Sequence, residues 1–194
     1  MRVRFAKRIQ EIATKRAAVI VEAIVPWLMN KDGKILDFGC GLGHTGYLIS
    51  LKTGRQVEYY DVRKYPYPPE GVEIKVFDGK KLPCDAREFD TTLVIFILHH
   101  VPSPADSLKE VARVSNRYIL VCEDLLKSKG EIFVEAIKDG IANFFLPHMT
   151  LQYRIETDWE KMFEEMGFAI VEKTYFQTKY IFNFKHVAWL LSVP

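Results

Sequence analysis

The sequence predicts an α/β protein built around a parallel, doubly wound sheet, and three observations lead to this fold class. Short apolar runs alternate with helical patterns between residues 34 and 122. The run Thr91–Leu98 is apolar along nearly its whole length, as expected of a central strand that is buried on both faces. Two β-rich runs at the C-terminal end, Phe168–Phe176 and Tyr180–Leu191, are close enough to pair antiparallel at the sheet edge. Ligands of such sheets bind outside the carboxyl ends of the strands.

The size and composition of the chain predict a single domain over residues 1–194. This length can bury a core of ordinary size, and 48% hydrophobic with 27% charged residues is usual for a soluble globular protein. The net charge of +2 favours no class of partner. Three widely spaced cysteines, Cys40, Cys84 and Cys122, form neither a metal cluster nor a disulfide framework, so a cytoplasmic location is expected. No apolar stretch approaches the roughly 18 residues that span a bilayer.

Residues 5–29 predict an amphipathic helix, which would form an N-terminal cap of residues 1–30. Its apolar positions recur at a spacing of three to four and comprise Phe5, Ile9, Ile12, Val19, Ala23 and Trp27. Its first half is basic and contains Arg2, Arg4, Lys7, Arg8, Lys15 and Arg16 against the one acid Glu11. Such a basic face is either a solvated helix surface or a contact for an anionic substrate, a membrane surface or RNA.

From residue 30 onward the pattern alternates between strand and helix. A turn at Asn30–Gly33 leads into a short apolar strand, Lys34–Phe38, and then into a glycine-rich loop. The next elements are a helix and two strands, expected at Thr45–Lys52, Val57–Asp61 and Val72–Phe77. The proline-rich connection between these two strands cannot form a helix interior. Thr91–Leu98 is the fourth strand.

The second half of the chain continues this alternation and then departs from it. Ser103 is expected to cap a helix with Pro104 at its first position, and Tyr118–Cys122 is the fifth strand. Residues 131–146 carry an apolar helical stripe and lie within an insert, residues 125–157, that would act as a lid. Thr157–Glu160 predicts a capping box for a helix that ends at Gly167.

The loop after the first strand contains Gly41-Leu-Gly-His-Thr-Gly46, which matches the dinucleotide fingerprint G-x-G-x-x-G. Asp61 lies 20 residues beyond Gly41, as the ribose-binding acid of such a fold does. These two facts alone are compatible with a nicotinamide dinucleotide. The choice of cofactor therefore depends on the residues next to the loop.

Three acidic residues at three successive strand ends favour a different cofactor. Asp37 stands two residues before Gly39, where its carboxylate would repel a pyrophosphate but would attract the ammonium and sulfonium groups of S-adenosylmethionine (SAM). Asp61 can accept hydrogen bonds from both ribose hydroxyls, and Asp78 can accept one from an adenine amino group. The spacing of the three acids therefore favours SAM over a dinucleotide.

The same residues resemble the sequence motifs of class I, Rossmann-like SAM-dependent methyltransferases. Asp37-Phe-Gly-Cys-Gly-Leu-Gly43 looks like their first motif, and Tyr60-Asp61 looks like the ribose-binding acid of the second. Asp78–Pro83 resembles their adenine loop, and Phe89-Asp90 followed by Leu98–Val101 resembles the fourth-strand signature of the small type 11 subgroup. The resemblance implies a seven-stranded, mostly parallel sheet whose C-terminal strand is antiparallel.

The resemblance also implies a set of cofactor-binding residues for SAM and its product S-adenosylhomocysteine (SAH). The methionine end is expected at the first motif, which supplies Asp37, Gly39, Cys40, Gly41 and Gly43. The ribose and adenine are expected at Asp61, Val62, Asp78 and Gly79. Many relatives have a small polar residue in the middle of the fourth strand. This chain has Val94-Ile-Phe96 there, so only backbone carbonyl groups, at Ile95 or Phe96, could contact the cofactor.

Methyl transfer from a sulfonium requires alignment of donor and acceptor, and a base only where the acceptor must lose a proton. His99 and His100 follow the fourth strand and are the candidate bases, unless they only pack beneath the loop. Glu123 and Asp124 could hold a polar substrate or cap the next segment, and His148 is a weaker candidate. No metal-ligand spacing is present, so no metal is expected.

The function that this pattern predicts is methyl transfer from SAM to a small-molecule acceptor. An apolar or aromatic acceptor would suit the aromatic residues of the predicted lid and its surroundings, which are Phe133, Phe144, Phe145, Tyr153, Trp159 and Phe163. The same aromatic side chains could instead pack on the sheet. Three alternatives stay open: a non-catalytic SAM-binding module of a complex, a methyltransferase that acts on RNA, and an NAD-dependent oxidoreductase.

Overall fold

The computed structural model describes residues 2–126, 128, 131, 152–179 and 183–194, with the backbone alone for residues 2–7. Its helical elements are α1 (Arg2–Ile24), the 3-10 turn η1 (Val25–Trp27), α2 (His44–Thr53), the 3-10 turn η2 (Leu98–His100), α3 (Pro104–Val114) and α5 (Glu156–Glu165). Its strands are β1 (Ile35–Phe38), β2 (Val57–Asp61), β3 (Ile74–Val76), β4 (Phe89–Ile95), β5 (Ser115–Asp124), β6 (Ala169–Lys179) and β7 (Asn183–Ser192).

The seven strands form one sheet in the order β3-β2-β1-β4-β5-β7-β6. β1 pairs parallel with β2 and β4, and β4 pairs parallel with β5. β7 runs antiparallel to both of its neighbours, β5 and β6. The predicted fold class, with its antiparallel C-terminal strand, is confirmed. The last two strands pair antiparallel at an edge of the sheet as predicted, with β6 outermost and β7 between β6 and β5.

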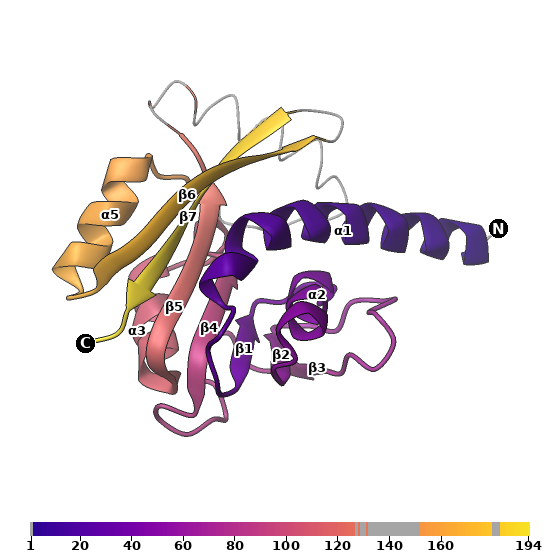
Figure 1. Ribbon diagram of the computed structural model, residues 1–194, viewed down its shortest axis with the longest axis horizontal. Helices are drawn as coiled ribbons and strands as arrows, with labels where there is room; N and C mark the ends of the chain where they lie inside the picture. The colour runs from indigo at the N-terminus through magenta and orange to yellow at the C-terminus, as the bar shows by residue number, and fades with distance from the viewer. Residues whose placement is uncertain (1, 127, 129–130, 132–151, 180–182) are drawn as a thin grey trace.

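Helices cover both faces of the sheet, which is the doubly wound arrangement (Figure 1). On one face, Leu108, Val111 and Val114 of α3 and Trp159 and Phe163 of α5 pack on the strands. On the other face, Ile20, Val21 and Ile24 of α1 and Ile49 of α2 do so. The N-terminal helix is amphipathic, but the predicted apolar stripe is wrong in part, because Ile12 and Val19 are 46% and 38% exposed and the buried face consists of Ala17, Ile20, Val21 and Ile24. The hydrophobic core therefore consists of two clusters, one on each face of the sheet.

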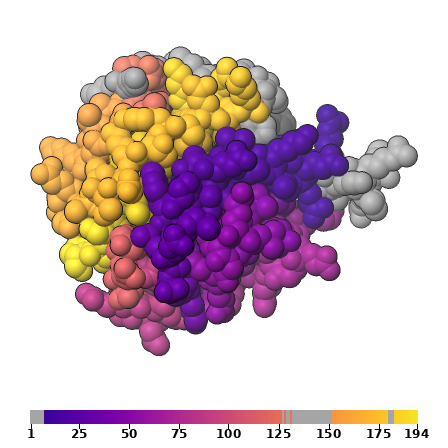
Figure 2. All heavy atoms as spheres, viewed as in Figure 1, coloured from indigo at the N-terminus to yellow at the C-terminus, as the bar shows by residue number. Residues whose placement is uncertain are grey.

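The long helix α1 lies between the β6–β7 hairpin and α2, and the rest of it extends beyond the sheet (Figures 1 and 2). It ends at Ile24, earlier than the predicted Met29, because Pro26 turns the chain into η1. Among the described residues, no helix is both long and apolar enough to cross a membrane.

Two local predictions at helix starts have different outcomes. Ser103 caps α3 as predicted, because its hydroxyl accepts a hydrogen bond from the backbone N–H of Asp106, with Pro104 at the first helical position. The predicted capping box at Thr157–Glu160 is wrong, because α5 begins at Glu156 and its cap position is Ile155, two residues before Thr157, with no side-chain cap. The N–H group of Glu156 is satisfied instead by the carbonyl oxygen of Leu126.

Most of the predicted lid falls outside the described residues. This applies to Phe133, Phe144, Phe145, Leu146 and His148, and to the predicted helix over residues 131–146. Of the aromatic residues near that segment, Trp159 and Phe163 are fully buried in the core against the sheet. These two residues therefore pack on the sheet and do not line a substrate pocket.

Candidate cofactor-binding site

The carboxyl ends of β1, β2, β3, β4 and β5 meet at one edge of the sheet, and the glycine loop leaves β1 at this edge. Positive φ angles at Gly39, Gly41 and Gly43, 69°, 56° and 76°, allow the chain to turn sharply there. The backbone N–H groups of Gly39 and Cys40 donate to the carbonyl oxygen of Tyr60 at 2.8 and 3.1 Å. The loop is thereby held against β2 at the carboxyl edge of the sheet, where the ligands of such sheets bind.

Asp61 at the end of β2 faces the glycine loop directly. It is 4% exposed, and its Oδ2 accepts a 2.8 Å hydrogen bond from the backbone N–H of Gly41. Burial raises the pKa of Asp61, and the N–H groups of Gly41 and Arg63 partly offset this rise. The predicted ribose-binding acid therefore also fixes the shape of the loop.

Asp37 lies on the other side of the same loop, buried inside β1. Its Oδ2 accepts a 3.2 Å hydrogen bond from the backbone N–H of Gly46 in the first turn of α2. Burial, with a smaller contribution from the charge of Asp61, raises the pKa of Asp37 to about 7, against the lowering effect of the Gly46 bond. A cation bound beside Asp37 would offset the cost of this buried charge.

Gly46 is the third glycine of the fingerprint, and it is required by packing. A Cβ atom at this position would lie 2.6 Å from Oδ2 of Asp37 and 2.8 Å from the ring of Tyr59. The absence of a side chain therefore allows α2 to approach β1 and β2 closely. This contact holds the carboxylate of Asp37 in place.

Cys40, between Asp37 and Asp61, is not a reactive thiol. Burial and the two nearby carboxylates raise the pKa of the Cys40 thiol far above its usual range. Its Sγ lies 3.8 Å from the carbonyl oxygen of Gly41. Cys40 therefore contributes only its backbone and a small polarisable side chain to the loop.

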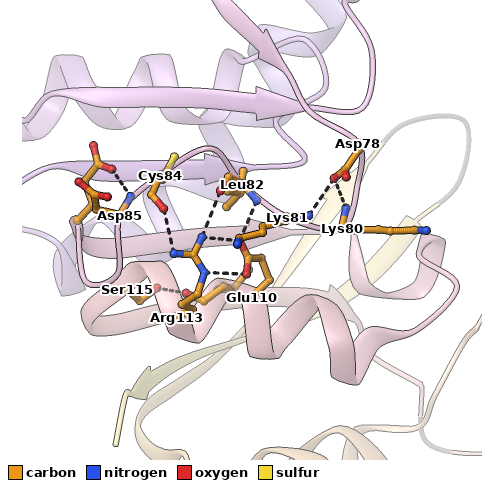
Figure 3. Close-up of polar contacts among 11 residues, drawn as sticks. Asp78, Lys80, Lys81, Leu82, Cys84, Asp85, Glu110, Arg113 and Ser115 are labelled. Carbon is orange, nitrogen blue, oxygen red and sulfur yellow. Dashed lines mark hydrogen bonds and ion pairs between the residues drawn. The ribbon is translucent and has the colours of Figure 1, made fainter.

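The predicted adenine residues lie on two neighbouring loops. The side chain of Val62 is 57% exposed, and a Cβ at Gly79 would lie 3.0 Å from it, so these two positions are adjacent. Oδ1 of Asp78 accepts hydrogen bonds from the backbone N–H groups of Lys80 and Lys81 at 2.8 and 2.9 Å (Figure 3). These bonds lower the pKa of Asp78, so one of its oxygens already closes its own turn.

An ion pair on α3 holds the loop that follows Asp78. Glu110 accepts a 2.8 Å hydrogen bond from the N–H of Leu82, and Arg113 donates to the carbonyl oxygens of Leu82 and Cys84 at 3.2 and 2.9 Å (Figure 3). Glu110 and Arg113 are joined by bonds of 2.6 and 2.9 Å. Sequence reasoning missed this clamp, although an acid and a base at a spacing of three residues were visible in the helix.

The fourth strand ends differently from the prediction, at Ile95 and not at Leu98. Phe96 has a φ of 54°, a left-handed conformation that is uncommon for a bulky side chain and that clusters at functional sites. Its N–H donates to the carbonyl oxygen of Cys122 at 2.9 Å. The turn then directs Ile97 against the glycine loop, where a Cβ at Gly39 would lie 2.6 Å from the Ile97 side chain.

The two predicted histidines have different surroundings. His99 is buried, its Nδ1 is bonded to Oε2 of Glu123, and its ring stacks on Tyr153 at a centroid distance of 5.0 Å. The other oxygen of Glu123 accepts from the N–H of Leu98 at 2.9 Å, so Glu123 is engaged by η2 and is not open to a substrate.

His100 is half-buried and has an unusual acid–base property. Burial, reinforced by neighbouring His99 and Arg16, lowers the pKa of His100 to about 3, although Asp124 acts in the opposite direction. Within the described part of the chain its Nδ1 is buried without a hydrogen-bond partner. The ring is therefore neutral near pH 7 and is a weak base, better suited to hydrogen bonding than to proton abstraction.

A third histidine at this edge of the sheet was missed by the sequence analysis. His186 of β7 is 1% exposed, and its Nδ1 lies 2.8 Å from Oδ1 of Asp124, with which it pairs across β5 and β7. Its Nε2 lies 2.7 Å from the hydroxyl of Thr178 on β6. The two residues of the Asp124–His186 pair are separated by 62 positions, so only the register of the hairpin could have predicted it.

Metal ligands are not gathered at this edge. In residues 2–126 and the other described segments, no three His, Cys, Asp or Glu side chains form a group that could hold a metal ion.

Comparison with known proteins gives a consistent family assignment. The sequence model described as a methyltransferase domain matches residues 7–173. The chain is 22% identical over 188 residues to the phosphatidylethanolamine N-methyltransferase of Cereibacter sphaeroides, covering 91% of this chain and 87% of that protein. It is 26% identical over 133 residues to the tRNA U34 carboxymethyltransferase of Saccharophagus degradans. This second match covers 60% of this chain and only 41% of that protein's length.

Solved structures share the fold. The magnesium protoporphyrin IX methyltransferase of Synechocystis PCC 6803, solved with bound SAH, superposes with a TM-score of 0.62 at 14% identity. The superposition covers 92% of this chain and 83% of that one.

Proposed function

The chain belongs to the family of methyltransferase domains, and from this premise we propose that it transfers the methyl group of SAM to a small-molecule acceptor. The observation that carries the proposal is the buried carboxylate of Asp37, held against the glycine loop by Gly46. SAM supplies an electrophilic methyl group on a sulfonium, so the protein has to bind, orient and exclude water.

The proposed cofactor contacts follow from the chemistry of the loop. Asp37 receives the ammonium group of the methionine end, because a buried carboxylate gains most from a cationic partner. Asp61 receives the ribose hydroxyls while it continues to hold the N–H of Gly41. The buried carboxylate of Asp37 beside this loop would repel a pyrophosphate, which disfavours a dinucleotide, whereas Asp61 suits either cofactor.

The proposed acceptor is a small molecule and not RNA. The relative named for a lipid headgroup amine matches 91% of this chain, whereas the relative named for tRNA matches 60%. Neutral His100 and the bonded pair of His99 with Glu123 favour a role in holding the acceptor over one in general-base catalysis.

Calorimetric titration of the protein with SAM, SAH and NADH in separate experiments tests the cofactor assignment. We expect SAM and SAH to bind with saturable heats and NADH to give none. Binding of NADH without binding of SAH would contradict the proposal. A salt-dependent affinity for RNA that is lost when Arg8, Lys15 and Arg16 are changed to glutamate would favour the RNA alternative.

The affinity for SAM should also depend on pH, with a defined sign. The carboxylate form of Asp37 binds the ammonium group, and its pKa of about 7 means that protonation competes with the ligand as the pH falls below this value. We expect the association constant to fall about tenfold or more between about pH 7.5 and about pH 5.5, measured by calorimetry.

The variant Asp37→Asn separates this effect from other titrations. An amide cannot ionise, so the variant should bind SAM weakly at the higher pH and should show a much smaller change with pH. An affinity of the native protein that is constant or rises toward pH 5.5 would exclude Asp37 as the ammonium ligand.

A further inference from the structure

A group of six residues lies beside the proposed cofactor loop, and none of them belongs to the proposed cofactor contacts. This acceptor-side cluster consists of Arg16, Phe96, His100, Asp124, Thr178 and His186. Its members come from α1, the turn after β4, η2, β5, β6 and β7, which meet on the α1 side of the sheet edge. Side chains from six separate elements therefore converge at one place.

His186 is the fixed centre of the acceptor-side cluster. A carboxylate can only accept a hydrogen bond, so Nδ1 of His186 donates to Asp124 at 2.8 Å. In the neutral ring, Nε2 then accepts from the hydroxyl of Thr178 at 2.7 Å. The rings of Phe96 and Phe176 pack on the imidazole at centroid distances of 4.6 and 5.0 Å. With both nitrogens bonded and the ring enclosed, His186 can move very little.

Asp124 is held on one side and accessible on the other. Oδ1 is bonded to His186, whereas no hydrogen bond to Oδ2 is found within the described part of the chain. The side chain is 12% exposed, and Oδ2 is not one of the fully buried polar atoms that lack a partner, so this oxygen reaches solvent. Burial alone would raise the pKa of Asp124, but the His186 bond and the charges of His99 and Arg16 lower it. Asp124 is therefore an oriented anion with an open oxygen.

Two further residues of the cluster, His100 and Arg16, add a hydrogen-bonding nitrogen and a positive charge. His100 presents a buried, unpartnered Nδ1, a second potential hydrogen-bond acceptor beside Asp124. The guanidinium of Arg16, on the exposed side, lies 4.9 Å from the centre of the Phe96 ring. Among the described residues, the cluster thus has hydrogen-bond acceptors inside and the cation of Arg16, stacked on Phe96, at its rim.

The acceptor-side cluster adjoins the donor end of the cofactor loop. Phe96 and Ile97 are consecutive, and the left-handed φ of Phe96 directs its ring to His186 while Ile97 contacts Gly39. A molecule bound at Asp124 would therefore be next to the proposed methionine end of SAM.

We propose that Asp124 binds the amino group of the methyl acceptor, that His186 is the positioning residue which aims this carboxylate, and that the acceptor is a small amine. This inference rests on the proposed function and extends it to a substrate class. An amine suits the cluster because its N–H groups match the two acceptors, Asp124 and His100. Its positive form is also attracted to the carboxylate of Asp124. An anionic substituent on the same molecule would find Arg16 at the rim.

The reaction balances without a further reagent. The amine reacts in its neutral form. Oδ2 of Asp124 accepts a hydrogen bond from one of the amine's N–H groups, which orients the nitrogen lone pair toward the methyl group of SAM. The new N–C bond forms as the S–C bond breaks, and the electron pair of the S–C bond stays on sulfur. The methylated ammonium then releases one proton through Asp124 to solvent.

Transfer of labelled methyl from SAM to matched acceptors tests the proposal. The pairs are ethanolamine with ethylene glycol, and benzylamine with benzyl alcohol, so that an amine is compared with a hydroxyl on the same frame. We expect methylation of the amines only.

The variant Asp124→Asn should lower kcat/KM for the amine by about 10- to 100-fold, the cost of a lost charged hydrogen bond. The affinity for SAH should stay within about twofold.

His186 variants separate positioning from folding. His186→Ala removes the donor to Asp124, whereas His186→Asn keeps an N–H group near the position of Nδ1. We expect the alanine variant to lose amine methylation about as strongly as Asp124→Asn, and the asparagine variant to recover most of it with unchanged SAH binding. The matched control is Asp106→Asn, an exposed acid on α3, which should behave as the native protein.

The possible outcomes distinguish a failure of the amine inference from a failure of the proposed function. If the native protein fails to bind SAH, the proposed function itself is wrong. If it binds SAH but methylates the alcohols, or neither member of each pair, the amine inference is overturned and the proposed function stands. Equal losses in both His186 variants would show that His186 acts on the hairpin's structure and not on Asp124.

Discussion

Gly46→Ala should destabilise the protein and remove SAM binding, although alanine is normally the better helix residue by about 1 kcal/mol. The added methyl group would lie 2.6 Å from Oδ2 of Asp37 and 2.8 Å from the Tyr59 ring, both fixed in the core. Overpacking of this kind costs roughly 1–3 kcal/mol, and α2 must also move away from the carboxylate that it holds. Thermal unfolding and SAH calorimetry would measure the two effects together.

A control on the same helix separates this clash from a general change in α2. Leu51 is 64% exposed, so Leu51→Ala should leave both the melting temperature and SAH affinity nearly unchanged. If Gly46→Ala were instead more stable than the native protein, the close packing of α2 on Asp37 would not exist in solution.

The second large effect is expected at Asp61. Asp61→Ala should weaken SAM binding by about 1–3 kcal/mol, because it removes the proposed ribose acceptor and also frees the N–H of Gly41. Asp61→Asn keeps one acceptor oxygen and should fall between the alanine variant and the native protein. Calorimetry with SAH measures both values.

Separate titrations with adenosine and with methionine show which part of the cofactor loses affinity in the Asp61→Ala variant. The alanine variant should bind adenosine more weakly, whereas methionine, which lacks the ribose, should be affected less. Asp106→Ala serves as the remote acidic control. An unchanged SAH affinity in Asp61→Ala would count against a ribose role and would leave Asp61 as a support of the loop alone.

Sequence reasoning predicted which residues meet at the glycine loop, because the information for this part of the fold is local. Asp37 and the glycines lie within a few residues of each other, and Asp61 follows at the end of the next strand. The roles of these residues as SAM ligands stay predictions, but their meeting at one sheet edge follows from the parallel topology alone.

The opposite side of the site could not be predicted in the same way. Asp124 meets His186 only through the register of an antiparallel pair, and Thr178 joins them from a third strand. A shift of this register by one residue would turn His186 to the other face of the sheet. The start of α5 was mispredicted for a similar reason, since the first N–H group of the helix, that of Glu156, is bonded to a carbonyl distant in sequence, that of Leu126.

The position of β7 inside the sheet has a consequence for the order in which the protein is assembled. In the strand order, β6 is bonded only to β7, which is made after it, and β7 is the strand that joins β6 to β5. During synthesis, β1, β2 and β4 can pair while the ribosome is still adding residues, whereas β6 can join the sheet only after β7 has been made. The cofactor loop can thus form before the β6–β7 hairpin places His186 and Thr178 beside Asp124.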